Sequence, residues 1–134
     1  MKTMIKWSNQ NMQITNQSAD QIIGVSVREE NGYTPVELLT SSLGLCIFIT
    51  ISRLFERDGI TIKENEFTVS VEAFKALRGP SRIEELLVEV SFPAYLEEAY
   101  RNKLIHSAEK ACTIGNTIKN GAKIMIRDGV IQSE

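Results

Sequence analysis

The 134-residue chain has few of the residue types that mark metal sites or charged partners. It contains one histidine and two cysteines, the latter far apart in the sequence. A structural zinc site needs about four ligands, commonly as closely spaced Cys or His pairs, so we expect no metal. Lys and Arg form no cluster, and the formal net charge of -2 disfavours nucleic acid or an anionic membrane surface as a partner.

Long hydrophobic runs are also missing. The first twelve residues hold no continuous apolar core of the kind that a signal peptide requires, and no uncharged run reaches the roughly 20 apolar residues that cross a bilayer. We therefore expect a cytoplasmic protein with no membrane partner. Permanent disulfides are uncommon in that compartment, so the two cysteines are expected to be either inert buried residues or reactive thiols.

Motifs for several other chemistries are absent. No Gly-rich phosphate loop precedes a helix, and the chain has no Gly-x-Ser-x-Gly, serine triad or pair of catalytic carboxylates. No repeat, low-complexity tract or linker divides the sequence. We therefore expect residues 1–134 to form a single domain that carries no cofactor.

The most distinctive segment that is present is an uncharged stretch around the first cysteine. Thr34 is a suitable N-cap, and Glu37 places a carboxylate at the positive end of the helix dipole. From Leu38 to Ser52 no residue is charged, which excludes an ordinary surface helix with one solvated face. The pattern predicts a buried helix that carries Cys46 near its middle and ends near Asp58.

The rest of the chain alternates between strand and helix patterns. Strands are predicted at residues 4–7, 12–14, 21–27, 67–73, 86–92 and 122–126. A second helix is expected from Ala94 to Ala111, and its apolar stripe at i and i+4 spacing continues to Cys112. That spacing turns Cys112 toward the first helix, so the two thiols can meet. A short helix or turn is expected from Thr113 to Lys119.

These residues resemble the OsmC/Ohr family, named for the osmotically inducible protein and the organic hydroperoxide resistance protein. The run Thr34-Pro35-Val36-Glu37-Leu38-Leu39 is similar to the family's Pro-x-Glu-Leu-Leu helix start, and Cys46 follows the proline by eleven residues. Cys112 lies 66 positions further on, after an amphipathic helix, as in the family. The resemblance implies an α+β, OsmC-like fold whose antiparallel sheets wrap around two long central helices in an intertwined homodimer.

The resemblance also implies a chemistry for the two cysteines. Cys46 would attack a hydroperoxide oxygen and become a sulfenic acid, and Cys112 would condense with it to form a disulfide. An external dithiol would then reduce that disulfide. The sequence departs from the peroxidase members at Val36, which stands where they carry a glutamate, and none of the cations before Cys46 aligns with their arginine.

Two other roles remain open for the same thiols. The chain could be a member without peroxidase activity that binds a small hydrophobic or thiol-reactive ligand in the cleft between the helices. Both cysteines could also be ordinary small core residues. A depressed pKa of Cys46 favours the enzyme, whereas a value near the unperturbed one of about 8.5, or above it, favours the binding protein.

Three further residues or segments near the thiols have expected roles. Glu37 is predicted to be a helix-start charge rather than an acid catalyst. His106 is predicted to be an ordinary helix residue, because six residues separate it from Cys112 and that is not a same-face spacing. The segment Thr113-Ile114-Gly115-Asn116 is predicted to present a helix N-terminus whose amides lower the pKa of Cys112.

Overall fold

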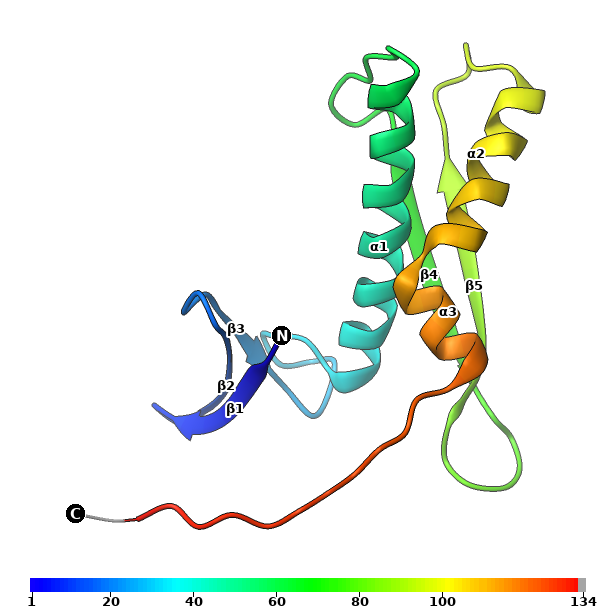
Figure 1. The fold of residues 1–134 in the computed structure, drawn as a ribbon. Helices are drawn as coiled ribbons and strands as arrows, with labels where there is room; N and C mark the ends of the chain where they lie inside the picture. The colour runs from blue at the N-terminus through cyan, green and yellow to red at the C-terminus, as the bar shows by residue number, and fades with distance from the viewer. Residues whose placement is uncertain (133–134) are drawn as a thin grey trace.

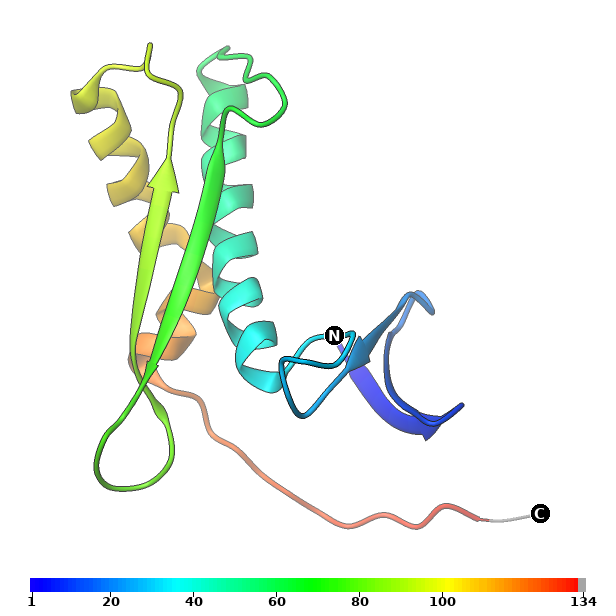
Figure 2. The same cartoon turned by 180° about the vertical axis from the view of Figure 1, so that it is seen from behind.

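The computed structural model describes residues 1–132 as two antiparallel sheets and three helices. The elements in chain order are β1 (Thr3–Ser8), β2 (Asn11–Asn16), β3 (Gln21–Gly24), α1 (Pro35–Arg57), β4 (Thr68–Lys75), β5 (Ile83–Ser91), α2 (Glu98–Ala111) and α3 (Thr113–Asn120). Figures 1 and 2 show the three helices on one face of the β4–β5 hairpin, with the β1–β3 sheet beyond the N-terminal end of α1. The predicted α+β class is confirmed.

The N-terminal sheet has the predicted hairpin followed by a third strand. Asn9 and Gln10 form the turn, with positive φ at both positions, which matches the twist of a two-residue hairpin. The third strand ends at Gly24, whereas we predicted that it would continue to residue 27. It ends there because the chain folds back and the amide of Val25 donates to the carbonyl of Tyr33 at 3.0 Å.

The long helix α1 begins and ends where the sequence predicts. The hydroxyl of Thr34 accepts a hydrogen bond from the amide of Glu37 at 3.2 Å, and the carboxylate of Glu37 accepts one from the amide of Thr34 at 3.0 Å. This capping box satisfies two amides that the helix itself cannot pair. Glu37 is therefore a helix-start residue, as predicted, and Asp58 caps the other end of α1.

A single copy of the chain covers only part of α1. Ile51 and Phe55 are buried, but Leu45, Phe48 and Ile49 are exposed to solvent. By length and composition alone, α1 could also cross a membrane, with a mean hydropathy of 1.8, although the core helices of water-soluble proteins meet the same criterion. Adjacent exposed apolar side chains on one helix are typical of a surface that contacts another molecule.

The core lies between α1, α2 and the β4–β5 hairpin. Its fully buried members are Ile51, Phe55, Phe67, Leu104 and Ala108. The rings of Phe55 and Phe67 meet edge to face, with centroids 5.3 Å apart, an arrangement that the ring quadrupoles favour. The two strands beneath these residues are adjacent and antiparallel, as predicted.

The second helix begins later than predicted, at Glu98 instead of Ala94. The intervening residues form a turn in which the amide of Leu96 donates to the carbonyl of Pro93. The predicted apolar stripe is confirmed, since Leu104 and Ala108 are buried and lead to the buried Cys112. The short helix α3 follows directly, at the predicted place.

The predicted last strand is wrong. Residues 122–132 form no helix or strand, and they extend away from the rest of the molecule as the red segment of Figure 1. Their apolar side chains, including Ile124, Ile126 and Val130, are exposed. The alternating pattern favours an extended backbone, but a strand also needs a neighbouring edge to bond, and residues 1–132 place none beside this segment.

The position of the core gives a first prediction. Leu104→Ala is expected to lower the free energy of unfolding by about 2–5 kcal/mol, because it leaves a cavity at a side chain that is only 2% exposed. Leu87→Ala makes the same chemical change on β5 at a side chain that is 55% exposed, and it should cost less than about 1 kcal/mol. Urea denaturation at one protein concentration measures both. Equal losses would contradict this core.

Candidate functional site

The two cysteines come together at the centre of the molecule. Cys46 lies in the middle of α1 and is partly exposed, whereas Cys112 is 2% exposed at the junction of α2 and α3. Both are free thiols, and they lie close enough together that each shifts the pKa of the other. The prediction that the two thiols can meet is therefore confirmed.

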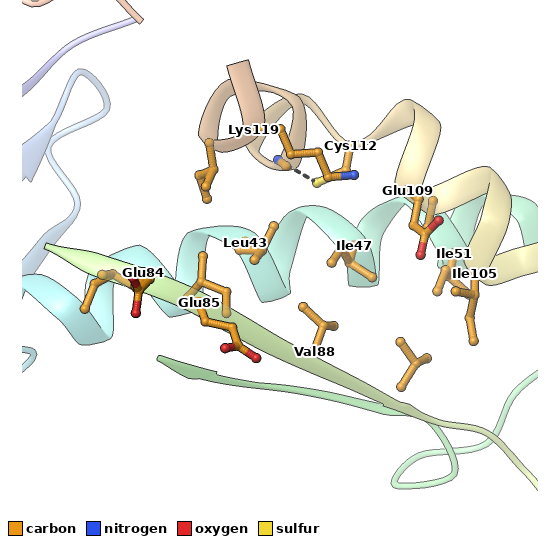
Figure 3. Close-up of a pocket in the computed structure, with 16 residues that line it drawn as sticks. Leu43, Ile47, Ile51, Glu84, Glu85, Val88, Ile105, Glu109, Cys112 and Lys119 are labelled. Atoms are coloured by element: carbon orange, nitrogen blue, oxygen red, sulfur yellow. Dashed lines mark hydrogen bonds between the residues drawn. The ribbon is translucent and has the colours of Figure 1, made fainter. Parts of the chain in front are cut away.

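Cys112 connects two helices. Its amide donates to the carbonyl of Ala108 at 3.0 Å at the end of α2, and its Sγ accepts from the amide of Gly115 at 3.2 Å at the start of α3. Figure 3 draws this second bond as a dashed line. A Cβ on Gly115 would lie 3.4 Å from Cys112 Sγ and 3.7 Å from Leu43 Cδ1. These are ordinary van der Waals distances, so the first turn of α3 packs against the thiol and α1 without a requirement for glycine at this position.

The surroundings of Cys46 lower the pKa of its thiol. Burial is the largest single effect and raises the pKa, but hydrogen bonds from the amide of Ile114, the thiol of Cys112 and the amide of Thr113 together outweigh it. These donors stabilise the thiolate, which is the nucleophilic form of cysteine. The direction of this shift favours a reactive Cys46 over an inert core residue.

The pKa of Cys112 is shifted in the opposite direction, above its ordinary value. Burial raises the pKa of its thiol, and the hydrogen bond with Cys46 raises it further, while the Gly115 amide opposes both effects without cancelling them. The amides of Gly115 and Ile114 at the start of α3 lower the pKa of Cys112, as predicted, but burial and Cys46 outweigh them. The amides of Thr113 and Ile114 also lower the pKa of Cys46, which the sequence did not indicate because that effect depends on how α3 packs on α1.

Charged groups contribute little to this thiol pair. The Glu37 carboxylate is held in the capping box, and its pKa is lowered first by the hydrogen bonds with Thr34 and to a smaller degree by the charge of Arg28. His106 is exposed on α2, as expected of an ordinary helix residue. Within residues 1–132, the groups that lower the pKa of Cys46 are thus amides and a thiol rather than a lysine or arginine.

A cavity of about 480 Å³ adjoins Cys112 on the side that faces β5. Figure 3 shows its apolar walls and four charged residues beside them. Sequence reasoning did not single out these charged residues, which are Glu84, Glu85, Glu109 and Lys119. They come from three different elements, so no local sequence signal could bring them together. Among residues 1–132, no group of three or more His, Cys, Asp or Glu side chains could hold a metal ion.

The fold and the thiol pair can now be compared with known proteins. The family model of OsmC-like proteins matches residues 28–127, which is most of the chain. The chain therefore belongs to the OsmC-like protein family. No curated protein matches it.

Solved structures support the same fold at low sequence identity. An OsmC-like protein from Mycoplasma pneumoniae has a TM-score of 0.73 and 18% identity, covering 90% of this chain and 87% of the other. A putative osmotic stress induced and detoxification response protein from Psychrobacter arcticus has a TM-score of 0.72 and 20% identity, covering 87% of each chain. The organic hydroperoxide resistance protein OhrB of Bacillus subtilis has a TM-score of 0.63 and 16% identity, covering 90% of each. At these identities the likeness concerns the fold alone.

The opposite shifts of the two thiols can be measured. In wild type, the rate of alkylation by iodoacetamide is expected to rise with pH in two steps, with Cys46 ionising below and Cys112 above the unperturbed value of about 8.5. Cys112→Ala should raise the pKa of Cys46 because it removes a hydrogen-bond donor. Cys112→Ser keeps a donor and should raise it less. Peptide mapping by mass spectrometry assigns each step, and a Cys46 that ionises after Cys112 would contradict this account.

Proposed function

We propose that this chain is a thiol-dependent hydroperoxide reductase in which Cys46 attacks the peroxide and Cys112 resolves the product. The observation that carries the proposal is the placement of two free thiols beside each other, Cys46 in the middle of α1 and Cys112 at the start of α3, where their surroundings shift their pKa values in opposite directions. A low pKa gives Cys46 the thiolate needed for attack, while a high pKa keeps a proton on Cys112 until it is needed. Membership of a family associated with organic hydroperoxide resistance supports this choice of substrate.

The reaction balances with two thiols and one hydroperoxide. The Cys46 thiolate attacks one peroxide oxygen, the O–O bond breaks, and the alkoxide leaves as an alcohol after taking up a proton. Cys46 is then a sulfenic acid. The Cys112 sulfur attacks the Cys46 sulfur, a disulfide forms and water leaves. The peroxide gains the two electrons that the thiols lose, and an external dithiol restores both thiols by exchange.

The amides at the start of α3 take the place of a cation in this mechanism. In this chain Val36 replaces the glutamate of the peroxidase members, and Glu37 serves the helix cap. The amides of Thr113 and Ile114 lower the pKa of Cys46 without a charged partner. A reversible thiol pair of this kind needs a reducing compartment, so we place the protein in the cytoplasm.

We also propose that the protein works as a homodimer. Three exposed features support a second copy as the partner: the apolar face of α1 with Leu45, the edges of β1 and of the β4–β5 hairpin that no strand of residues 1–132 covers, and the extended segment 122–132. Unpaired edges and apolar surface both become more stable when another chain covers them. A symmetric pair would let each copy supply what the other lacks.

The peroxide reaction gives a direct prediction. Reduced wild type treated with about one equivalent of an organic hydroperoxide should lose both thiols and gain an intramolecular disulfide. Cys112→Ser should instead accumulate a Cys46 sulfenic acid that dimedone traps, and Cys46→Ser should keep its remaining thiol. Intact mass and free-thiol counting follow all three proteins. The proposal fails if both thiols of wild type survive for minutes and the variants behave alike.

The homodimer gives a separate prediction. Leu45→Glu should shift the protein from dimer to monomer, because it places a charge on the face of α1 where Leu45 is 61% exposed in a single copy. Leu77→Glu introduces the same charge at a loop residue that is 97% exposed and should leave the dimer intact. Sedimentation velocity measures both masses. A monomeric wild type, or a Leu45→Glu protein that remains dimeric, would refute this interface.

A further inference from the structure

The cavity beside Cys112 is large enough to hold a small molecule. It measures about 480 Å³ and lies between α1, β5, α2 and α3 (Figure 3). Its walls are apolar side chains of three of these elements: Leu43, Ile47 and Ile51 on α1, Val88 and Val90 on β5, and Ile105 on α2. Pockets of roughly 300–1,000 Å³ with such walls are typical of small-molecule sites.

The cavity does not include the proposed attacking thiol. Cys112 forms part of its wall, whereas Cys46 is not among the residues that line it. Ala108 and Gly115 also line the cavity near Cys112, and their small size leaves the space open there. The thiol pair therefore faces the cavity only through Cys112. A molecule bound here would lie directly against Cys112.

The charged residues of the cavity have an excess of negative charge. Glu84 and Glu85 lie on β5 and Glu109 on α2, and Lys119 on α3 is the one cation among the lining residues. All four are exposed to solvent, so they form what we call the charged rim. Glu84 also pairs with Arg82 at 3.5 Å, but Glu85 and Glu109 have no ion pair within residues 1–132. Such a rim attracts a cation and repels a carboxylate.

We propose that this cavity binds an amphipathic molecule with an apolar chain and a cationic head group. The chain lies against the walls of α1 and β5, and the head group lies at the charged rim near Glu85 and Glu109. Apolar burial supplies most of the affinity, and the rim selects the sign of the head group. This binding does not depend on peroxide chemistry, so either property can be present without the other.

Calorimetric titration of the reduced wild-type protein tests the site with two probes of equal chain length, decyltrimethylammonium and decanoate, below their micelle concentrations. The ammonium probe should bind saturably, and decanoate should bind at least about threefold more weakly. Val88→Trp fills the cavity and should abolish binding. Leu87→Trp, on the opposite face of the same strand, should not change it. Decanoate that binds as tightly as the ammonium, or no saturable binding to wild type, overturns the proposal.

Charge variants keep the test decisive if the tryptophan variant fails to fold. Glu85→Gln and Glu109→Gln should each weaken binding of decyltrimethylammonium by about threefold and strengthen binding of decanoate. Glu89→Gln removes the same charge from β5 at a residue that does not line the cavity, and it should change neither affinity. Equal effects of all three substitutions would show a general charge effect and would overturn the rim as the selective element.

A thiol readout places the ligand next to Cys112. In Cys46→Ser, which retains only Cys112, saturating decyltrimethylammonium should slow alkylation by N-ethylmaleimide by about tenfold or more, because the bound chain covers the sulfur. In Cys112→Ser, which retains only Cys46, the same addition should leave the rate unchanged. Slowing of both thiols or of neither overturns the assignment, whatever the outcome of the peroxide experiment.

Discussion

The proposed chemistry depends on how one short helix, α3, is held beside the thiols of Cys46 and Cys112. Cys112 ends α2 and caps α3, so a single residue fixes the direction of both helices. Because α3 is held in this way, its first amides reach the sulfur of Cys46 on α1. The packing of α3 on α1 therefore also determines which of the two thiols ionises at the lower pH.

Local signals in the sequence predict a large part of this arrangement. The cap at Thr34, the charge-free run and the Asp58-Gly59 stop define α1 almost to the residue. The apolar stripe of α2 continues at i and i+4 spacing to Cys112 and so predicts that this residue faces α1. Helical spacing can be read from the local sequence. The motif around Pro35 and Cys46 indicates the family, which the match over residues 28–127 confirms.

Except for the start of α2, which a local turn at Pro93 delays to Glu98, the errors concern relations between distant residues. The segment 122–126 alternates like a strand, but whether it pairs depends on a strand edge that residues 1–132 do not place beside it. The third strand ends at Gly24 because of a bond with Tyr33, nine residues further on. The pKa of Cys112 and the charged rim of the cavity likewise arise where separate elements meet. Secondary-structure propensity and hydrophobic periodicity carry no information about contacts between separate elements.

The position of the Cys112 sulfur at the head of α3 links the oxidation state of the protein to the order of its backbone. In the reduced protein that sulfur accepts a hydrogen bond from the amide of Gly115. In a disulfide the Cys112 sulfur is bonded to Cys46 and is a poorer hydrogen-bond acceptor. The amide of Gly115, which has no partner within the helix, then loses this hydrogen bond. The first turn of α3 would then be less ordered in the oxidised protein than in the reduced one, although Asn116 still bonds to the carbonyls of Cys112 and Lys110. The order of this stretch of backbone would thus report the state of the two thiols.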